Sequence, residues 1–520
     1  MKSMKLRSVT AALAGMLLVG WGVNAMADTT DDLLQALIAK GVLTEEEAAP
    51  LLKGREAEIN KKAQDKNSEI KASFKDGIGF ESGDHQNAIS VNGRIQADYH
   101  TYGQANAQNT DTFDVRRAYL TVKGKFYSDY EFNVTADFGQ GQTTACPVGT
   151  ACTATNQLDV AYFGINWWES ARLRFGQIDM PFGMEHLTSD LFTDFTERGL
   201  TEALVPGKER GAEVFGTPAK GVWYGLALST GRGKNVNNAD NQVDGLDVIG
   251  RATVNLADIF NQQGVVYHVG ADFSHGNVSA DQATNSGVLA TNSFLVGQGN
   301  AKSQTEGRGI TFFSPGSLNM APGADVERTR MGLEAAIGYG PFKVQSEWMR
   351  HDYNGVSLST PTGSTSHNFD KNVSAWYVSA NWILTGESYV DTYKEGVWGR
   401  IHPKNEFVHP SAGEGIGAWV VGIRFDQYNA DDFAFGTGAG AVSKISTTPG
   451  AIGNGISTPD GAHAWTAGVT WILNPNLRFQ ANYIDTKFEN GYVAFKDDQG
   501  NVKGITNGEK AVTLRGTFDF

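Results

Sequence analysis

Apolar and polar residues alternate with a period of two along most of the chain, and the pattern continues to the last residue. In the final segment, one face carries Val512, Leu514, Gly516, Phe518 and Phe520, and the other carries Thr513, Arg515, Thr517 and Asp519. Strict alternation predicts a β-strand with one apolar and one polar face. A long apolar edge of this kind is unsuited to a soluble sheet, so we interpret it as a strand of a closed barrel whose outside contacts lipid.

About 16 segments with this alternation follow one another from about residue 75 onward. Two clear examples are VNGRIQADYH at 91–100 and VVYHVGADFS at 265–274. The others lie near residues 112–124, 129–139, 156–166, 171–179, 210–216, 221–230, 246–256, 329–351 as a pair, 373–384, 415–428, 462–474, 476–487 and 509–520. An even number of antiparallel strands is typical of single-chain bacterial barrels, and a barrel of this size encloses an aqueous channel. The sequence therefore predicts an all-β fold, a transmembrane antiparallel β-barrel over residues 74–520.

The connections between these segments alternate between short and long. Those at 340–341 and 474–476 are short, whereas those at 275–328 and 429–461 are long and polar. This asymmetry is typical of outer-membrane barrels, which have short periplasmic turns and longer extracellular loops.

Residues 1–27 have the features of an export signal. They carry Lys2, Lys5 and Arg7, then the apolar run AALAGMLLVGWGV, then NAMA before Asp28. A basic start, a short apolar region and an A-x-A site are typical of a secretory signal peptide, so we predict cleavage after Ala27. The alternative, a transmembrane anchor, would need roughly 20 apolar residues, and this run is too short. No stretch after it approaches that length.

Residues 28–73 have the rhythm of helices rather than the alternation of strands. Thr44 precedes three glutamates, which is a favourable helix start, and the apolar residues of DDLLQALIAK form one stripe. We predict a short periplasmic helical or coiled-coil segment before the barrel. A solvated, partly ordered tail is the alternative.

Composition agrees with many strands joined by tight turns, with 62 Gly, 14 Pro and 11% aromatic residues. The mean hydropathy of −0.31 is too polar for helical membrane spans. The formal net charge is −14, and loss of the three basic residues of the signal peptide leaves 40 Lys and Arg against 57 Asp and Glu, or −17. This charge excludes a general affinity for nucleic acid or anionic lipid.

Motifs for catalysis or cofactor binding are weak. The glycine-rich runs GEGIGAW and GTGAGAVSK do not follow a strand and open a helix, as a dinucleotide or phosphate loop would. The ten histidines lack metal-ligand spacing. We therefore predict no cofactor, no bound metal and no enzymatic activity. An outer-membrane hydrolase that assembles Ser and His across strands is the alternative.

The two cysteines, Cys146 and Cys152, lie in the Gly-, Thr- and Ala-rich run GQTTACPVGTACTATN. In an oxidising compartment, this close spacing predicts a disulfide. We expect the disulfide to pin a surface loop and to carry no chemistry.

Arginines recur on the polar face of many different segments. They are Arg94, Arg172, Arg174, Arg251, Arg330, Arg424, Arg478 and Arg515. A guanidinium that faces acyl chains costs roughly 2–4 kcal/mol near the midplane, so we place these side chains in the lumen, where fixed cations would attract anions. The alternative is that lumen acids such as Asp98, Glu334, Glu347 and Asp426 neutralise them.

Residues 179–210 are too long for a turn and too apolar for an external loop. We expect this segment to fold into the barrel and form its narrowest point. Met180, Phe182, Met184, Leu187 and Phe195 would pack on the wall, while Glu185, His186, Thr188, Ser189, Asp190, Glu197 and Arg198 would meet the solute. An ordered external loop is the alternative.

Several of these segments together resemble the phosphate-selective porin O/P family. They are GRIQADY at 93–99, VRRAYL at 115–120, RFGQIDMPFGMEHLTSDLFTDFTERGL at 174–200, AWYVSANWILTGE at 375–387, GAWVVGIRFD at 417–426, WILNPNLRFQANY at 471–483 and the terminal FDF. The resemblance implies a homotrimer of 16-stranded barrels, each with an inward-folded third loop and an arginine ladder. It also implies that Arg94, Arg116 and Arg117 match family arginines and that Asp159 matches an acid near the constriction.

The chain departs from the family pattern within the constriction loop. Phosphate-selective members have lysine where this chain has His186, and serine followed by lysine where it has Asp190 and Leu191. Histidine, with a reference pKa of about 6.5, is only partly charged near neutral pH, and an added aspartate repels a dianion at close range. We therefore expect phosphate selectivity to be weaker than the family name suggests.

Together these features predict a passive porin in the outer membrane of a Gram-negative bacterium, which conducts small ionic solutes and favours anions, with phosphate and polyphosphate among the candidates. We expect outer-membrane lipid, the barrel-assembly machinery through Phe520 and two further copies of the chain as partners, and no nucleic acid. The alternatives are a general or cation-preferring porin and a structural barrel that tethers the envelope.

Overall fold

The computed structural model describes residues 69–103 except 75 and 76, 111–139, 157–231, 233–234, 246–279, 303–313, 325–358, 366–409, 411, 415–433, 459–496 and 502–520, with scattered positions between 38 and 53. The chain forms two compact units, residues 1–70 with 82–84 and residues 71–81 with 85–520. The predicted signal peptide and the two cysteines lie outside the described residues.

In the first unit, the described helical positions begin near the expected helix start. Ala48 N–H donates to Thr44 O at 3.0 Å, and Ala48 is buried. Strand β1, Ile70–Ser73, occupies the end of the segment for which the sequence suggested helix. The extent and role of the helical segment stay predictions. None of the helices in the described part of the chain is long and apolar enough to cross a membrane.

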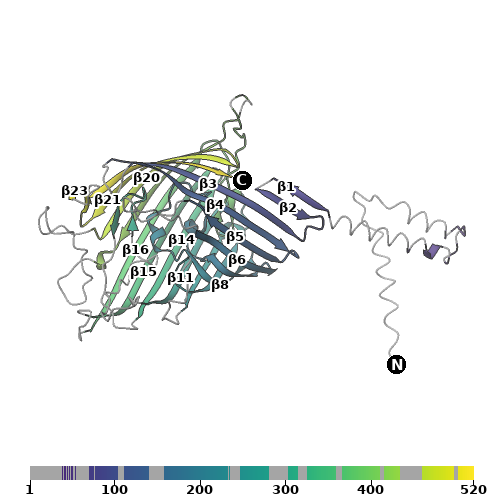
Figure 1. Cartoon of the computed structure of the whole chain (residues 1–520), viewed down its shortest axis with the longest axis horizontal. Coiled ribbons are helices and arrows are strands. Elements are labelled where there is room, and N and C mark those ends of the chain that lie inside the picture. Colours follow the sequence, from purple (N-terminus) through teal and green to yellow (C-terminus); the bar gives the residue numbers. More distant parts are fainter. Residues whose placement is uncertain are drawn as a thin grey trace, which may run out of the picture. The chain divides into compact units, whose positions relative to one another are not determined.

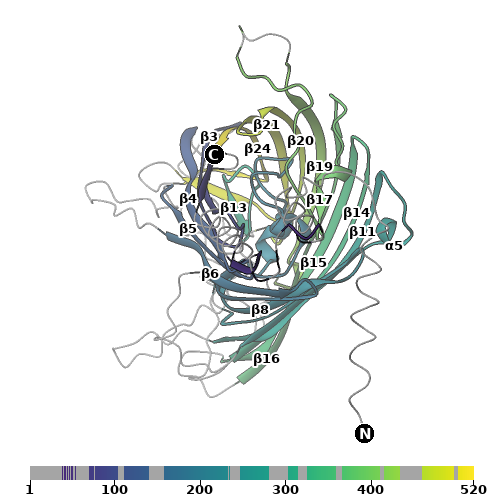
Figure 2. The same ribbon diagram turned by 90° about the vertical axis from the view of Figure 1, so that its right-hand side faces the viewer.

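Sixteen of the described strands form a closed antiparallel barrel, in which each pairs with the next barrel strand along the chain (Figure 1, Figure 2). They are β3 Ala88–Tyr102, β4 Thr112–Phe126, β5 Tyr130–Asp137, β6 Gln157–Trp168, β7 Ala171–Asp179, β8 Lys208–Ala219, β9 Val222–Ser229, β10 Asp247–Asn255, β11 Val265–Ser279, β14 Asp325–Tyr339, β15 Phe342–Leu358, β16 Ser366–Ile383, β19 Ala418–Asn429, β20 Gly461–Asn474, β21 Leu477–Glu489 and β24 Gly508–Asp519. The last strand, β24, pairs with the first, β3. The predicted fold class is confirmed.

The barrel seam closes at the final residue. Gly93 N–H donates to Phe520 O at 3.1 Å, and Phe520 N–H donates to Gly93 O at 3.0 Å. A Cβ at Gly93 would lie 2.5 Å from Cε1 of the Phe520 ring, so only glycine leaves room for that ring.

Shorter elements complete the described part of the chain. They are β2 Ile78–Ser82, β12 Ser303–Gln304, β13 Thr311–Phe313, β17 Tyr393–Lys394, β18 Val397–Trp398, β22 Val493–Lys496, β23 Val502–Thr506, α4 Met184–Leu187, α5 Leu256–Ile259, η1 Leu200–Leu204, η3 Val390–Thr392 and η5 Asp431–Phe433. Strand β2 adds to the barrel sheet beside β3, and the strand pairs β12–β13, β17–β18 and β22–β23 stand outside it.

Burial follows the alternation along each barrel strand. On β14, Leu333 and Ile337 are more than half exposed, whereas Arg330 and Glu334 are buried. The apolar positions therefore face outward and the polar ones inward, as lipid outside and a polar lumen require. Strand β15 runs beyond its predicted end at residue 351, because outward positions there are polar, such as Asp352, and no longer mark the strand.

One connection differs from the expected short turns. Residues 384–417, between β16 and β19, leave from the end of the barrel that carries the β14–β15 turn, since Ile383 N–H donates to Pro341 O at 2.9 Å. The expectation of short connections at that end is wrong here. Trp398, in β18, is buried in an apolar cluster with inward-facing residues such as Val266 and Ala336. The part of this connection around Trp398 therefore folds back into the lumen.

Candidate functional site

The segment between β7 and β8, residues 180–207, lies inside the barrel, and we name it the constriction loop. Its side chains Met180, Phe182 and Leu204 are fully buried. They belong to one apolar cluster with Met349 and Tyr353, which point inward from β15. Met180 and Phe182 pack there as the sequence suggested, and Met184 and Phe195 are buried too, whereas Leu187 is half-buried and lines the cavity described below. The loop therefore lies inside the barrel and is not an external loop.

Acidic side chains of the barrel wall hold the start of the loop through its backbone. Asp272 accepts a hydrogen bond from Gly183 N–H at 3.1 Å. Glu347 accepts from Glu185 N–H at 3.0 Å and also from Met184 N–H. These hydrogen bonds fix the start of the loop against β11 and β15.

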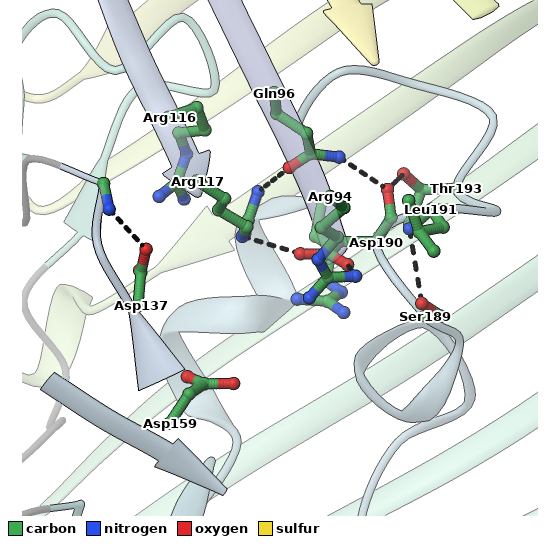
Figure 3. A network of polar contacts seen from close by, with 12 residues as sticks. Arg94, Gln96, Arg116, Arg117, Asp137, Asp159, Ser189, Asp190, Leu191 and Thr193 are labelled. Carbon is green, nitrogen blue, oxygen red and sulfur yellow. Dashed lines mark hydrogen bonds and ion pairs between the residues drawn. The ribbon is translucent and has the colours of Figure 1, made fainter. Parts of the chain in front are cut away.

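Asp190 connects the loop to the opposite wall, formed by β3 and β4 (Figure 3). Its carboxylate lies between Arg94 and Arg117, with Arg117 Nε 2.6 Å from Oδ2 and Arg94 Nη1 in contact with Oδ1. Gln96 joins them, since it accepts from Arg117 Nη1 at 2.9 Å and donates to Asp190 O at 3.3 Å. Burial by itself would raise the pKa of Asp190, but Arg94 and Arg117 hold it well below its usual range. The carboxylate therefore stays ionised.

A β-bulge turns two consecutive arginines inward. In the β3–β4 pairing, Gln96 pairs with Arg117 and Ala97 pairs with Val115, which leaves Arg116 as the extra residue. Regular alternation would place one of the two arginines in lipid, whereas here both reach the constriction loop. Only the family resemblance indicated these two residues, because the bulge has no signal in the alternation.

A second acid of the loop, Glu197, joins β4 to the closing strand β24. Arg116 Nε lies 2.9 Å from Glu197 Oε1, and Arg515 Nη2 lies 2.6 Å from the same oxygen. Arg515 also binds both oxygens of Asp98, at 2.8 and 2.7 Å. Burial would raise the pKa of Glu197, but Arg116 and Arg515 hold it well below its usual range.

Arg424, on β19, binds another acid of the loop, Glu185. Its guanidinium lies 3.1 Å from Glu185 Oε1, 2.8 Å from Glu306 Oε2 and 2.8 Å from Asp426 Oδ2. Glu306 comes from the 303–313 segment, which the sequence placed in a long external loop. That segment therefore also enters the lumen.

The remaining predicted arginines also point inward, and most have acidic partners. Arg251 binds both oxygens of Glu334, at 2.8 and 2.7 Å. The other pairs are Arg330 with Asp247 at 3.3 Å, Arg172 with Glu395 at 3.0 Å and Arg174 with Glu131 at 3.0 Å, while Arg478 donates to Asp190 O at 3.0 Å. Nine of the ten predicted arginines thus pair with a described carboxylate. Their attraction for anions stays a prediction.

Other predicted side chains brace the loop internally. His186 Nδ1 lies 3.0 Å from Glu202 Oε1, and Arg198 donates to the carbonyl oxygens of His186 and Thr188, each at 2.9 Å. Ser189 Oγ accepts from Leu191 N–H at 3.3 Å. Burial would raise the pKa of Glu202, but His186 and Arg198 lower it to about 2.

A cavity of about 550 Å³ lies beside the Asp190 network. Among its lining side chains, six are basic and four are acidic: Arg94, Arg117, Lys123, Arg198, Lys208 and Arg400, with Asp159, Asp179, Asp190 and Asp519. Asp159, predicted near the constriction, lies 3.3 Å from Lys208 Nζ and 3.2 Å from Lys234 Nζ. The described residues contain no group of three or more His, Cys, Asp or Glu side chains that could hold a metal ion.

The 384–417 connection supplies a wall of the site that the sequence did not indicate. Arg400 binds Asp519 and lies with its guanidinium carbon 5.1 Å from the centre of the Phe192 ring of the constriction loop. Tyr389 donates to Asp194 of the same loop at 2.8 Å. The loop is therefore held from the short-turn end as well as from the wall. The only signal in the sequence was the unusual length of this connection.

Comparison with known proteins identifies the family. Residues 89–513 match the family described as phosphate-selective porin O and P. The chain belongs to this family. It is a porin of the outer membrane of a Gram-negative bacterium, and the family points to a channel rather than an enzyme.

Among individual relatives, Porin O of Pseudomonas aeruginosa is 24% identical over 445 residues, which cover 84% of this chain and 91% of that protein. Two solved structures are similar at lower identity. The in-vitro folded trimer form of OmpT of Vibrio cholerae has a TM-score of 0.44 at 8% identity and covers 84% of this chain and 99% of that one. The Salmonella typhi OmpF complex with daunomycin has a TM-score of 0.42 at 12% identity, over 84% and 98%.

Proposed function

We propose that this porin is a passive diffusion channel with a moderate preference for small anions. The cavity beside the constriction loop carries the proposal, because six basic and four acidic side chains line it. This local excess of positive charge contrasts with the formal charge of −14 for the whole chain. Fixed cations at a narrow point lower the entry barrier for anions.

The ion pairs of the lumen limit the strength of this preference. Each arginine that pairs with a carboxylate contributes little net charge to a passing solute, so the channel differs from a ladder of free guanidinium groups. Lys123 is exposed in the cavity and forms no ion pair with any described carboxylate. Arg94 and Arg117 share one carboxylate, so together with it they keep a net positive charge. We expect this charge and that of Lys123 to supply most of the attraction for anions.

We also propose that phosphate is not strongly selected. His186 stands where the resemblance suggests a lysine, and its ring lies near two acids, 3.0 Å from Glu202 and 3.7 Å from Asp179. Asp190 and Leu191 stand where serine and lysine are expected, and both line the cavity. A dianion therefore meets an added carboxylate and lacks two ammonium groups.

The zero-current potential across a KCl gradient tests the proposal on the purified protein in a planar bilayer. We expect a potential of the sign for anion preference, little change on addition of phosphate, and phosphate sensitivity in His186→Lys. A cation-preferring potential would refute the anion preference, and strong phosphate block of the wild type would refute the weak phosphate selection. Complete absence of chloride flux would favour the tethering barrel.

The assembly of the protein is a separate proposal. The family resemblance supports a homotrimer, and the exposed terminal ring of Phe520 supports recognition by the barrel-assembly machinery. Native mass measurement in detergent should give three copies per particle. Deletion of Phe520 should lower the yield of folded barrel in the outer membrane without changing synthesis.

A further inference from the structure

The Arg94–Arg117 pair has the geometry of an anion site. Two guanidinium groups from neighbouring strands converge on the two oxygens of one carboxylate, that of Asp190. Arg478 donates to the backbone carbonyl oxygen of the same residue at 3.0 Å. The two guanidinium groups of Arg94 and Arg117 thus outnumber the one carboxylate that they share.

Asp190 differs in its position from Glu185 and Glu197, the other acids of the constriction loop that bind arginines of the barrel wall. Asp190, Arg94 and Arg117 all line the cavity, whereas Glu185 and Glu197 do not. The side chains of Arg94, Arg117 and Asp190 retain 16, 11 and 12% exposure. The pair therefore lies at the boundary of the open lumen, where a mobile anion reaches it if the aspartate is absent.

We propose that Arg94 and Arg117 form a binding site for a small carboxylate and that Asp190 fills it as a tethered ligand. This inference rests on the proposed function, since it assumes that anions enter the cavity. A ligand held on the same chain acts at a high effective concentration, so free anions compete poorly with it. The tethered carboxylate thereby prevents passing anions from binding at this site, where a bound anion would slow the passage of others.

Chemical rescue with acetate tests the site. Asp190→Ala removes a carboxymethyl group, and acetate has the size and charge to replace it. In the wild type, single-channel current in KCl should be insensitive to added acetate. In Asp190→Ala, the single-channel current should fall to a plateau as acetate is added. Half of this effect should occur at an acetate concentration at least about tenfold lower than any that affects the wild type. A single hydrogen bond to a charged group of this kind changes binding by about that factor.

Two variants control for charge and for the pair itself. Asp194→Ala removes an acid four positions along the same loop, but Asp194 pairs with Lys343 and does not line the cavity. This variant should show no acetate plateau. Asp190→Ala combined with Arg94→Gln should lose the plateau, because one half of the site is then gone.

Asp190→Asn covers the case in which the alanine variant folds poorly or shifts the loop. The amide keeps the shape of the side chain and removes its charge, so the zero-current potential should move towards anions by more than in Asp194→Asn. An acetate plateau in Asp194→Ala equal to that in Asp190→Ala, or no plateau and no shift in either Asp190 variant, would overturn the inference. A cation-preferring wild type that still gains an acetate plateau in Asp190→Ala would refute only the proposed anion preference.

Discussion

Inward-facing arginines lie on both sides of the lumen, but their surroundings differ. On the side formed by β10, β11 and β14, Arg251 and Glu334 are buried beneath the constriction loop and the 384–417 connection, and Arg251 donates to Gly396 O at 2.8 Å. On the side formed by β3 and β4, Arg94 and Arg117 border a cavity of about 550 Å³. The same type of ion pair is therefore enclosed on one side and borders an open cavity on the other.

The difference predicts separate consequences for stability and for selectivity. Removal of one partner of a buried ion pair leaves an unpaired charge and costs about 3–5 kcal/mol, whereas pairs exposed to water are worth about 1 kcal/mol or less. Charge changes beside the cavity act on the solute instead. Variants of the packed side should thus affect folding, and variants of the open side should affect the zero-current potential.

Replacement of Arg424 should have the largest effect. Arg424 is almost fully buried and binds Glu185, Glu306 and Asp426. Arg424→Gln leaves these carboxylates without their guanidinium, so we expect a loss of about 3–5 kcal/mol in the free energy of unfolding. Urea unfolding in detergent micelles, followed by the mobility of the folded barrel on gels, measures this loss.

Arg172→Gln is the matched control for that experiment. Arg172 pairs with Glu395 at 3.0 Å, but both side chains are partly exposed. The expected loss is about 1 kcal/mol or less. Equal losses in Arg424→Gln and Arg172→Gln would show that burial does not separate the two classes of ion pair.

Replacement of Lys123 should change selectivity and leave stability unchanged. Lys123→Gln removes an exposed positive charge from the cavity wall. In water, one unit charge changes the energy of an ion a few ångströms away by less than about 1 kcal/mol. We therefore expect the anion-to-cation permeability ratio to fall by about twofold. The zero-current potential measures the ratio.

Lys220→Gln makes the same change of charge away from the cavity. Lys220 lies in the turn between β8 and β9 and donates to Asn261 Oδ1 at 2.7 Å. The Lys220→Gln variant should therefore leave the zero-current potential unchanged. An equal shift in both lysine variants would mean that the total charge of the barrel, and not the cavity lining, sets the selectivity.

The sequence predicted the barrel because the alternation of apolar and polar residues follows from the local surroundings of each strand position. Each outward position contacts lipid, so side chains such as Leu333 and Ile337 alternate with lumen residues at every strand. The alternation failed where that cause is absent. In the second half of β15, outward residues such as Asp352 are polar, and at the β3–β4 bulge the backbone itself shifts the faces.

The candidate site was only partly predictable for a related reason. The sequence placed arginines in the lumen, but pairs such as Arg424 with Glu306 join segments more than 100 residues apart. No periodicity records which acid meets which arginine, nor that Arg400 returns from the short-turn end. The distinction between a packed and an open side is therefore a property of the loops that cover each wall, and the strands alone do not determine it.

Acidification should have the smallest effect on selectivity. It tests whether Glu185 acts as a packed structural contact or as a charge that acts on the solute. Burial raises the pKa of Glu185, although Arg424 and Arg198 oppose the shift. As the pH falls through this raised pKa, Glu185 loses its negative charge while both arginines stay charged, so the constriction gains positive charge. The pKa values of Asp190 and Glu197 are held well below their usual range, so these two acids stay ionised over the same interval.

We therefore expect the anion-to-cation permeability ratio to rise modestly between pH 7 and about pH 4, which is close to the ordinary pKa of a glutamate. Glu185→Gln should start at the higher ratio and rise less. Any other group that titrates in this interval is present in both proteins, so the difference between the wild type and Glu185→Gln is the quantity to measure. If the permeability ratios of the wild type and Glu185→Gln rise in parallel, Glu185 belongs with the packed structural contacts. If the ratio rises less in the variant, Glu185 belongs with the groups that act on the solute.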